Sequence, residues 1–393
     1  MTPKQRMLNA YRGIPNDRPP VAPEFWYYYP AKVLGVDMIE FGKTPFHRAL
    51  KATFEKFGCE GWGIVGCGAP VDGLQWEREE KWLDADTVAR RSTVHTPKGT
   101  LASASHQTRH EPGWTTERYI KDFDRDLPAF DYLTLGGDIN RLDPTGAINA
   151  WKEVGESYLL EMGVGTPFFD YVAEGREGGF EAAVVDFMER ERELDALRER
   201  YTDHKVSLVR ALCEKTPFES FFIGCSWSCN SLIGPAMWRR WDKPYIKAIA
   251  DEVHRNGKLL HIHFHGRCME TVADFAEIGV DCVCPFERPP GGDVGGPAEL
   301  REIARRLDGR TTFNGNIHTV ETLIRGTPDD VRREVGEVLD AFAGNPRVIV
   351  GTGDQVGAET PEANLHALFE AAYGKGSTAM RKYPSAGNGG GFV

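Results

Sequence analysis

A short apolar run followed by a charge-rich helical stretch recurs along this 393-residue chain and constrains its fold more than any other feature. Strands that alternate with helices predict a parallel sheet with crossover helices. The expected strands occupy residues 20–25, 61–66, 158–162, 220–225, 258–264, 280–286, 311–316 and 347–351. Eight such units predict an α/β fold, a single (β/α)₈ barrel (a TIM barrel), which often runs long as one domain.

Helix starts between these strands support the alternation. Thr327 is an expected N-cap, Pro328 fits the first helical position, and the acids that follow suit the positive end of the helix dipole. Pro297-Ala298-Glu299 and Thr360-Pro361-Glu362 predict two further helix starts of the same kind.

Two segments in the N-terminal half exceed a minimal barrel. Residues 93–103, with Pro97-Lys98-Gly99 at their centre, predict an added β-hairpin. Residues 170–215 are charged and predict a helical insertion. We interpret both as additions to one barrel that spans residues 1–384, followed by a flexible Gly-rich tail at 385–393.

The charge and the apolar patterning exclude several classes of function. The formal charge of −11 argues against nucleic-acid binding and against an anionic membrane surface. The sequence contains no apolar run of about 18 residues, so we expect no membrane span, and the first residues lack the apolar core of a signal peptide. The eight cysteines form no CxxC pair, and we interpret them as reduced, mostly core thiols of a cytoplasmic protein.

Three histidines alternate along the fifth expected strand. Residues two apart share a face of a strand, so His261, His263 and His265 point one way, into the bore, while the apolar residues between them meet the helices. Same-face neighbours are about 6.5 Å apart, so two of them reach one metal ion more easily than three. We expect His263 and His265 to bind metal, and His261 to lie deeper as a supporting or hydrogen-bonded core residue.

Polar residues also follow three later strands. Glu287, His318 and Asp354 each lie just past an apolar run, where barrel enzymes place their chemistry, and are candidate catalytic residues. Two histidines and a carboxylate form a common ligand set for Zn²⁺ and for non-haem Fe²⁺, which makes Asp354 the expected third ligand. Structural alternatives remain: Asp354 and His318 as helix caps, and Glu287 as an ion-pair partner of Arg288.

Aromatic residues are concentrated after the first strand. Trp26 and Tyr28 belong to a ring-rich segment, Phe25 to Tyr29, that is expected to stack on an aromatic substrate or, alternatively, to form a hydrophobic lid on the barrel.

The order of several motifs resembles the uroporphyrinogen decarboxylase superfamily, whose members are (β/α)₈ barrels. The motifs are Arg18–Val21, Gly234–Trp238, Lys243–Tyr245, His263–Gly266, Gly315–Ile317, Gly326–Val331 and Thr360–Asn364. The resemblance implies that Trp227 and Asn230, which follow the fourth strand, contact substrate. His261, from its place on the histidine strand, is a further candidate for substrate binding. Their structural alternative is a role in the loop itself.

The superfamily has two main chemistries, and this chain resembles one of them more. True uroporphyrinogen decarboxylases carry an arginine-rich segment after the first strand, whereas residues 24–30 here contain no arginine. Zinc-dependent corrinoid methyltransferases hold their metal through a histidine and two cysteines, at positions that match His263, His265 and Asp354. Replacing both thiolates by an imidazole and a carboxylate makes the metal harder and better suited to an oxygen ligand.

The resemblance therefore implies a zinc-dependent methyltransferase that moves a methyl group between a small aromatic methoxy substrate and a corrinoid, by O-demethylation. A corrinoid protein is the implied partner, and members of the superfamily often form homodimers. One alternative is a metal-dependent decarboxylase or lyase without a corrinoid, in which Asp354 or His318 acts as acid and base. Another is a non-catalytic binding protein on the same scaffold.

Overall fold

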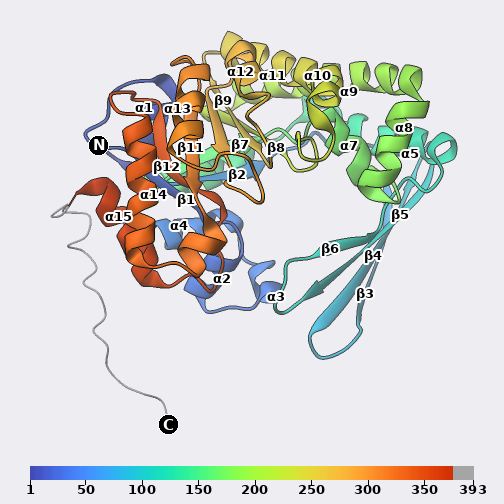
Figure 1. Ribbon diagram of the computed structural model, residues 1–393. Coiled ribbons are helices and arrows are strands. Elements are labelled where there is room, and N and C mark those ends of the chain that lie inside the picture. Colours follow the sequence, from blue (N-terminus) through green and yellow to red (C-terminus); the bar gives the residue numbers. More distant parts are fainter. Residues whose placement is uncertain (375–393) are drawn as a thin grey trace.

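Eight parallel strands form one curled, barrel-like sheet (Figure 1). The computed structural model describes residues 1–374, so the expected Gly-rich tail at 385–393 lies outside the described residues. The strands are β1 (Val21–Glu24), β2 (Trp62–Gly66), β7 (Leu159–Gly163), β8 (Ser220–Cys225), β9 (Leu259–Phe264), β10 (Cys282–Pro285), β11 (Thr312–Ile317) and β12 (Val348–Gln355).

The strand order confirms the predicted barrel. Neighbours in the sheet run β1-β12-β11-β10-β9-β8-β7-β2, and each expected strand is found at its predicted place. Within residues 1–374, β1 pairs with β12 and β2 pairs with β7, but no ladder joins β1 to β2. The sheet is therefore barrel-like, with one seam between its first two strands.

Helices surround the sheet, as the alternation requires (Figure 1). The helices are α1 (Pro3–Arg12), α2 (Tyr28–Leu34), α3 (Met38–Phe41), α4 (Phe46–Phe57), α5 (Phe123–Leu135), α6 (Thr145–Val154), α7 (Phe168–Gly175), α8 (Gly179–Glu189), α9 (Glu191–Lys215), α10 (Gly234–Trp241), α11 (Lys243–Arg255), α12 (Val272–Ile278), α13 (Pro297–Arg306), α14 (Pro328–Ala341) and α15 (Glu362–Tyr373), with the short helices η1 (Ile139–Arg141) and η2 (Thr319–Ile324).

The predicted helix starts are close to those observed. Thr327 caps α14 in a full capping box with Asp330, and Pro297 opens α13. Helix α15 begins one residue later than the pattern predicts, because Pro361 occupies the N-cap position and the Thr360 hydroxyl makes no capping bond.

The predicted hairpin is the centre of a larger antiparallel sheet that projects from the barrel (Figure 1). Strands β4 (Thr87–Thr96) and β5 (Gly99–Thr108) form the hairpin, and β3 (Gln75–Trp82) and β6 (Trp114–Glu117) flank it. Strand β3 was not predicted, because every residue in it is exposed and its centre is charged. The predicted helical insertion corresponds to α7, α8 and α9.

Apolar packing differs on the two faces of β9. Phe264 points outward, with its ring centroid 5.7 Å from that of Trp238 on α10 and 5.1 Å from that of Phe275 on α12. Inside the bore a separate buried cluster forms, and α1 contributes Tyr11 and three neighbouring side chains to it. Helix α1 therefore closes the end of the bore that lies away from the carboxyl ends of the strands. No helix in the described residues is long and apolar enough to cross a membrane.

Candidate metal centre

Two histidines face each other at the carboxyl end of β9. The Nε2 atoms of His263 and His265 lie 2.8 Å apart. His263 Nδ1 contacts the Cys284 Sγ at 3.1 Å, and His265 Nδ1 contacts Glu287 Oε1 at 3.1 Å. Each ring therefore has a protein partner at Nδ1 and turns Nε2 toward the other ring, which is the arrangement expected when a second partner orients a metal-binding imidazole.

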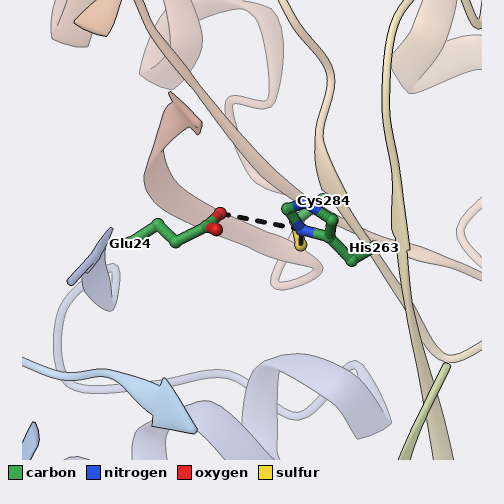
Figure 2. A group of neighbouring side chains, drawn as sticks. All are labelled: Glu24, His263 and Cys284. Carbon is green, nitrogen blue, oxygen red and sulfur yellow. Dashed lines mark hydrogen bonds and ion pairs between the residues drawn. The ribbon is translucent and has the colours of Figure 1, made fainter. Parts of the chain in front are cut away.

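Glu24 approaches the first of these histidines from the end of β1. Its Oε2 atom lies 3.6 Å from His263 Nδ1, is buried, and accepts no hydrogen bond from a described residue. Figure 2 shows the carboxylate directed at the imidazole, with Cys284 beside the ring. Glu24, His263 and Cys284 offer ligand atoms within 4.8 Å of one another.

A second group adjoins it on the open side of the site. His265, Glu287 and Asp354 also offer ligand atoms within 4.8 Å of one another, and all three are half-buried. Glu287 lies in the loop after β10, and Asp354 is the last residue but one of β12. Together with His265 after β9, three different strand ends supply this group. A zinc ion bonds nitrogen and oxygen at about 2 Å, so small side-chain adjustments bring such donors onto one ion.

The protonation states of the two histidines are opposed. Burial, together with the neighbouring His265 and His261 rings, holds the pKa of His263 well below its usual value, so this imidazole is neutral and has a free lone pair for a metal. For His265, burial lowers the pKa, but the hydrogen bond to Glu287 and the charge of Asp354 outweigh it and raise the pKa to about 9.

Two carboxyl groups of the site, Glu24 and Asp354, have raised pKa values. Burial, and then the charge of Asp354, raises the pKa of Glu24 well above its usual value. Burial also raises the pKa of Asp354, against the opposing effect of His265. Three carboxyl groups are thus crowded at one place with too little positive charge, an arrangement that a divalent cation relieves.

His261 lies one step deeper and is fully buried. Its Nδ1 atom lies 2.9 Å from Glu161 Oε2 and 3.1 Å from the Tyr11 hydroxyl, and its Nε2 atom lies 3.2 Å from the Cys284 Sγ. These contacts are those of a hydrogen-bonded core residue, one of the two roles expected for His261 from the strand pattern. His261 does not line the cavity above His263 and His265.

A cavity of about 520 Å³ opens over His263 and His265. Aromatic side chains of Trp26, Tyr27, Trp62 and Phe222 form much of its wall, together with Glu24 and Asp354. Trp26 and Trp62 pack with ring centroids 5.3 Å apart, and Trp62 and Phe222 stack at 5.2 Å. The described lining contains no lysine or arginine.

Besides His261 and Glu287, four residues singled out in the sequence lie outside this cavity. The Tyr28 hydroxyl donates to Glu111 Oε2 at 2.5 Å, and its neighbour Tyr27 lines the cavity instead. Trp227 lines a separate hollow with Arg118, whose guanidinium carbon lies 5.2 Å from the ring centroid. Asn230 donates to the Thr271 hydroxyl at 3.0 Å.

His318 is the fourth residue, and backbone groups occupy its ring. Its Nδ1 atom accepts from the backbone nitrogens of Val320 at 3.2 Å and Glu321 at 3.1 Å, so it caps η2. Its Nε2 atom lies 3.1 Å from the Pro289 carbonyl oxygen, so both ring nitrogens already have partners. The alternative role as a helix cap agrees with these contacts.

Two residues of the site escaped the sequence analysis. Cys284 was interpreted as a core thiol, and it occupies the position on β10 that pairs with His263 on β9. Glu24 was interpreted only as the first residue of the arginine-free segment 24–30. The available signal for Glu24 was its place at the end of the first strand, the same signal that singled out Glu287 and Asp354.

The fold and the site together place this chain in the class of α/β-barrel proteins that carry a candidate metal site, made of histidines and carboxylates, at the carboxyl ends of their strands. The model of the uroporphyrinogen decarboxylase family, URO-D, matches residues 147–374, which is 228 of the 393 residues. The chain belongs to this family, and the resemblance noted in its motifs is confirmed.

Curated relatives include both chemistries of the superfamily. A uroporphyrinogen decarboxylase of Xylella fastidiosa is 29% identical over 117 residues, 29% of this chain and 30% of the relative. The methylcobamide:CoM methyltransferase MtbA of Methanosarcina mazei is 26% identical over 177 residues, 45% of this chain and 48% of the relative. The chain thus matches less than half the length of either curated relative.

One solved structure is similar over nearly the whole fold. A methyltransferase from Methanosarcina mazei superposes with a TM-score of 0.63 and 18% identity, and the match covers 95% of this chain and 98% of that one. At this identity the likeness shows the shared fold.

Proposed function

We propose that this protein is a zinc-dependent methyltransferase that transfers a methyl group from a small aromatic methoxy substrate to a corrinoid. The carrying observation is the pair of opposed His263 and His265 Nε2 atoms, 2.8 Å apart, at the base of a ring-lined cavity. The similarity to MtbA, a methylcobamide:CoM methyltransferase, supports the choice of reaction class.

The donor set fits a zinc ion. His263, His265 and Asp354 are the proposed ligands, and the unpartnered buried Oε2 atom of Glu24 is a further donor beside them. Two imidazoles with carboxylates also suit Fe²⁺, so metal analysis has to include both ions. Glu287 is proposed to accept the Nδ1 proton of His265, which keeps Nε2 available and fixes the ring.

The bound zinc would supply Lewis acidity to the ether oxygen of the substrate. The rings of Trp26, Trp62 and Phe222 would hold the substrate ring and exclude water from it. The methyl group would leave without the electrons of the broken O–CH₃ bond, which the aryl oxygen would keep as a phenolate, and a reduced Co(I) corrinoid would supply the electron pair of the new bond. His318 is proposed to cap η2 and to take no part in catalysis, because both of its ring nitrogens have backbone partners.

The cavity lining also argues against a porphyrinogen substrate. A porphyrinogen carries eight carboxylates and needs several basic side chains, whereas the described lining has no lysine or arginine and is rich in rings. A small aromatic ether matches this composition better.

The test is methyl transfer by the zinc-loaded protein to free cob(I)alamin from a panel of neutral and anionic methoxybenzenes. We expect the cob(I)alamin absorbance to fall while the matching phenol forms. Neither change should occur in His263→Ala, whereas both should occur in His110→Ala, which alters an exposed loop residue. No transfer with any member of the panel would overturn the proposal. Turnover of a carboxylate substrate in cobalamin-free buffer would favour the metal-dependent decarboxylase or lyase.

A further inference from the structure

A second cavity, of about 400 Å³, adjoins the ring-lined one. The two share Ile64, Gly163 and Gly165, so they meet at the carboxyl ends of β2 and β7. The walls of the second cavity are mostly glycine and apolar side chains, and helix α9 contributes His204 and Lys205. Lys205 is the one charged side chain in this described lining.

The Lys205 ammonium has no anionic partner in the described part of the chain: no hydrogen bond and no ion pair within 4.0 Å involves it. Tyr201 places its ring centroid 5.5 Å away, and Glu174 is close enough to influence the lysine through its charge but does not contact it. Burial lowers the pKa of Lys205 from its usual value. Lys205 is half-buried. A partly desolvated cation without an anionic partner costs free energy, and a bound anion would offset that cost.

The backbone is shaped to admit this ammonium at the junction of the two cavities. Gly165 has a φ of +103°, and a Cβ added there would lie 2.8 Å from Lys205 Nζ. Gly165 lines both cavities, so the ammonium stands where a ligand in the ring-lined cavity would extend into the second one. His204 beside it has a pKa lowered by burial and by Lys205, and so adds no second charge at neutral pH.

We propose that Lys205 binds the carboxylate of an aromatic substrate, so that the substrate class is a methoxylated aromatic carboxylate. This inference rests on the proposed function, with the ether end toward His263 and His265 and the anionic end toward α9. One ammonium among apolar walls matches a single negative charge, not the dense charge of a phosphate or a porphyrinogen.

The experiment compares equilibrium binding of 4-methoxybenzoate and the neutral 4-methoxybenzamide by calorimetry, without cobalamin. In the wild-type protein the carboxylate should bind at least tenfold more tightly than the amide. Lys205→Met should abolish that preference, and Lys247→Met, which removes an exposed lysine paired with Asp251 on α11, should keep it. Equal carboxylate preference in wild type and Lys205→Met would overturn the inference.

The same comparison in His263→Ala separates the lysine from the metal. If the carboxylate binds at Lys205, the preference persists when the metal site is damaged. If it binds the metal, the preference disappears in His263→Ala and survives in Lys205→Met, which would overturn the inference. The experiment measures binding and not methyl transfer. Its result therefore does not depend on whether the proposed methyl transfer takes place.

Two further measurements separate ligand binding from a structural role. Lys205→Met removes an unpartnered cation, so its Tm should equal or exceed that of the wild type. Glu174→Gln removes a nearby negative charge and should strengthen carboxylate binding. A markedly lower Tm in Lys205→Met, together with unchanged binding in Glu174→Gln, would identify Lys205 as an internal partner of Glu174 and overturn the inference.

Discussion

The proposed metal ligands predict a clear result for metal content. His263→Ala and Asp354→Ala each remove a proposed ligand, so the zinc bound per chain should fall from about one toward zero. His110→Ala should retain the wild-type value. Elemental analysis of the purified proteins measures this, and unchanged zinc in both ligand variants would show that the ion, if present, is held elsewhere.

Glu287 is expected to act on the metal through His265. Its Oε1 atom lies 3.1 Å from His265 Nδ1, and a glutamine there keeps the shape but loses the negative charge that holds the proton on Nδ1 and makes the imidazole a stronger metal donor at Nε2. Glu287→Gln should weaken zinc binding by roughly 10–100-fold. Competition with a chromophoric chelator measures the affinity, and Glu189→Gln, an exposed change on α8, is the matched control. An affinity equal to the wild type would contradict the orienting role.

For the individual residues of the site, the sequence predicts only part of the arrangement. The alternation of His261, His263 and His265 follows from the period of a strand, so their shared face could be predicted from the residues alone. Cys284 reaches His263 because β10 pairs with β9 in one particular register, and Glu24 reaches it across the barrel mouth. Register and curvature depend on the packing of the whole sheet, and no local pattern in the sequence reports them.

Helix α11 is tied to the sheet by a pH-sensitive contact. His254 Nε2 lies 2.8 Å from Asp281 Oδ2, and the same oxygen accepts from the Leu260 backbone nitrogen at 2.7 Å. The hydrogen bond to Asp281 raises the pKa of His254 in the folded protein. The stability it contributes is therefore fully present below the unfolded pKa of about 6.5 and is lost as pH rises through the folded value.

His254→Gln should lower the Tm more at pH 6 than at pH 9. Thermal unfolding at both values measures the difference, with His110→Gln as a control that should show none. An equal loss of Tm at both pH values would contradict the proton-linked contribution.

Elements were predictable where their residues are buried on both faces. The barrel strands are short apolar runs with clear ends, and so each was found from its composition. Strand β3 is different, because all eight of its residues are exposed and its centre reads Glu77-Arg78-Glu79-Glu80-Lys81. Its pairing with β4 holds it in place, and that partner cannot be read from the charges of β3 alone.

Across the whole molecule, stability should be unevenly distributed. Strand β3 lies at the edge of the antiparallel sheet and pairs only with β4, whereas β9 is buried and pairs with both β8 and β10. Amide hydrogens of β3 should therefore exchange much faster than those of β9. Hydrogen exchange followed by mass spectrometry measures this, and equal protection of the two strands would contradict the expectation.

Helix α1 gives the barrel an order of assembly in the cell. Tyr11 contacts His261, 250 positions later in the chain, and Arg347 binds the Tyr11 carbonyl from 336 positions away. A ribosome making about 5–20 residues per second releases α1 many seconds before either partner exists. The deepest layer beneath His263 and His265 therefore cannot close during most of synthesis, and the nascent chain has to keep the apolar face of α1 covered until its last strand emerges.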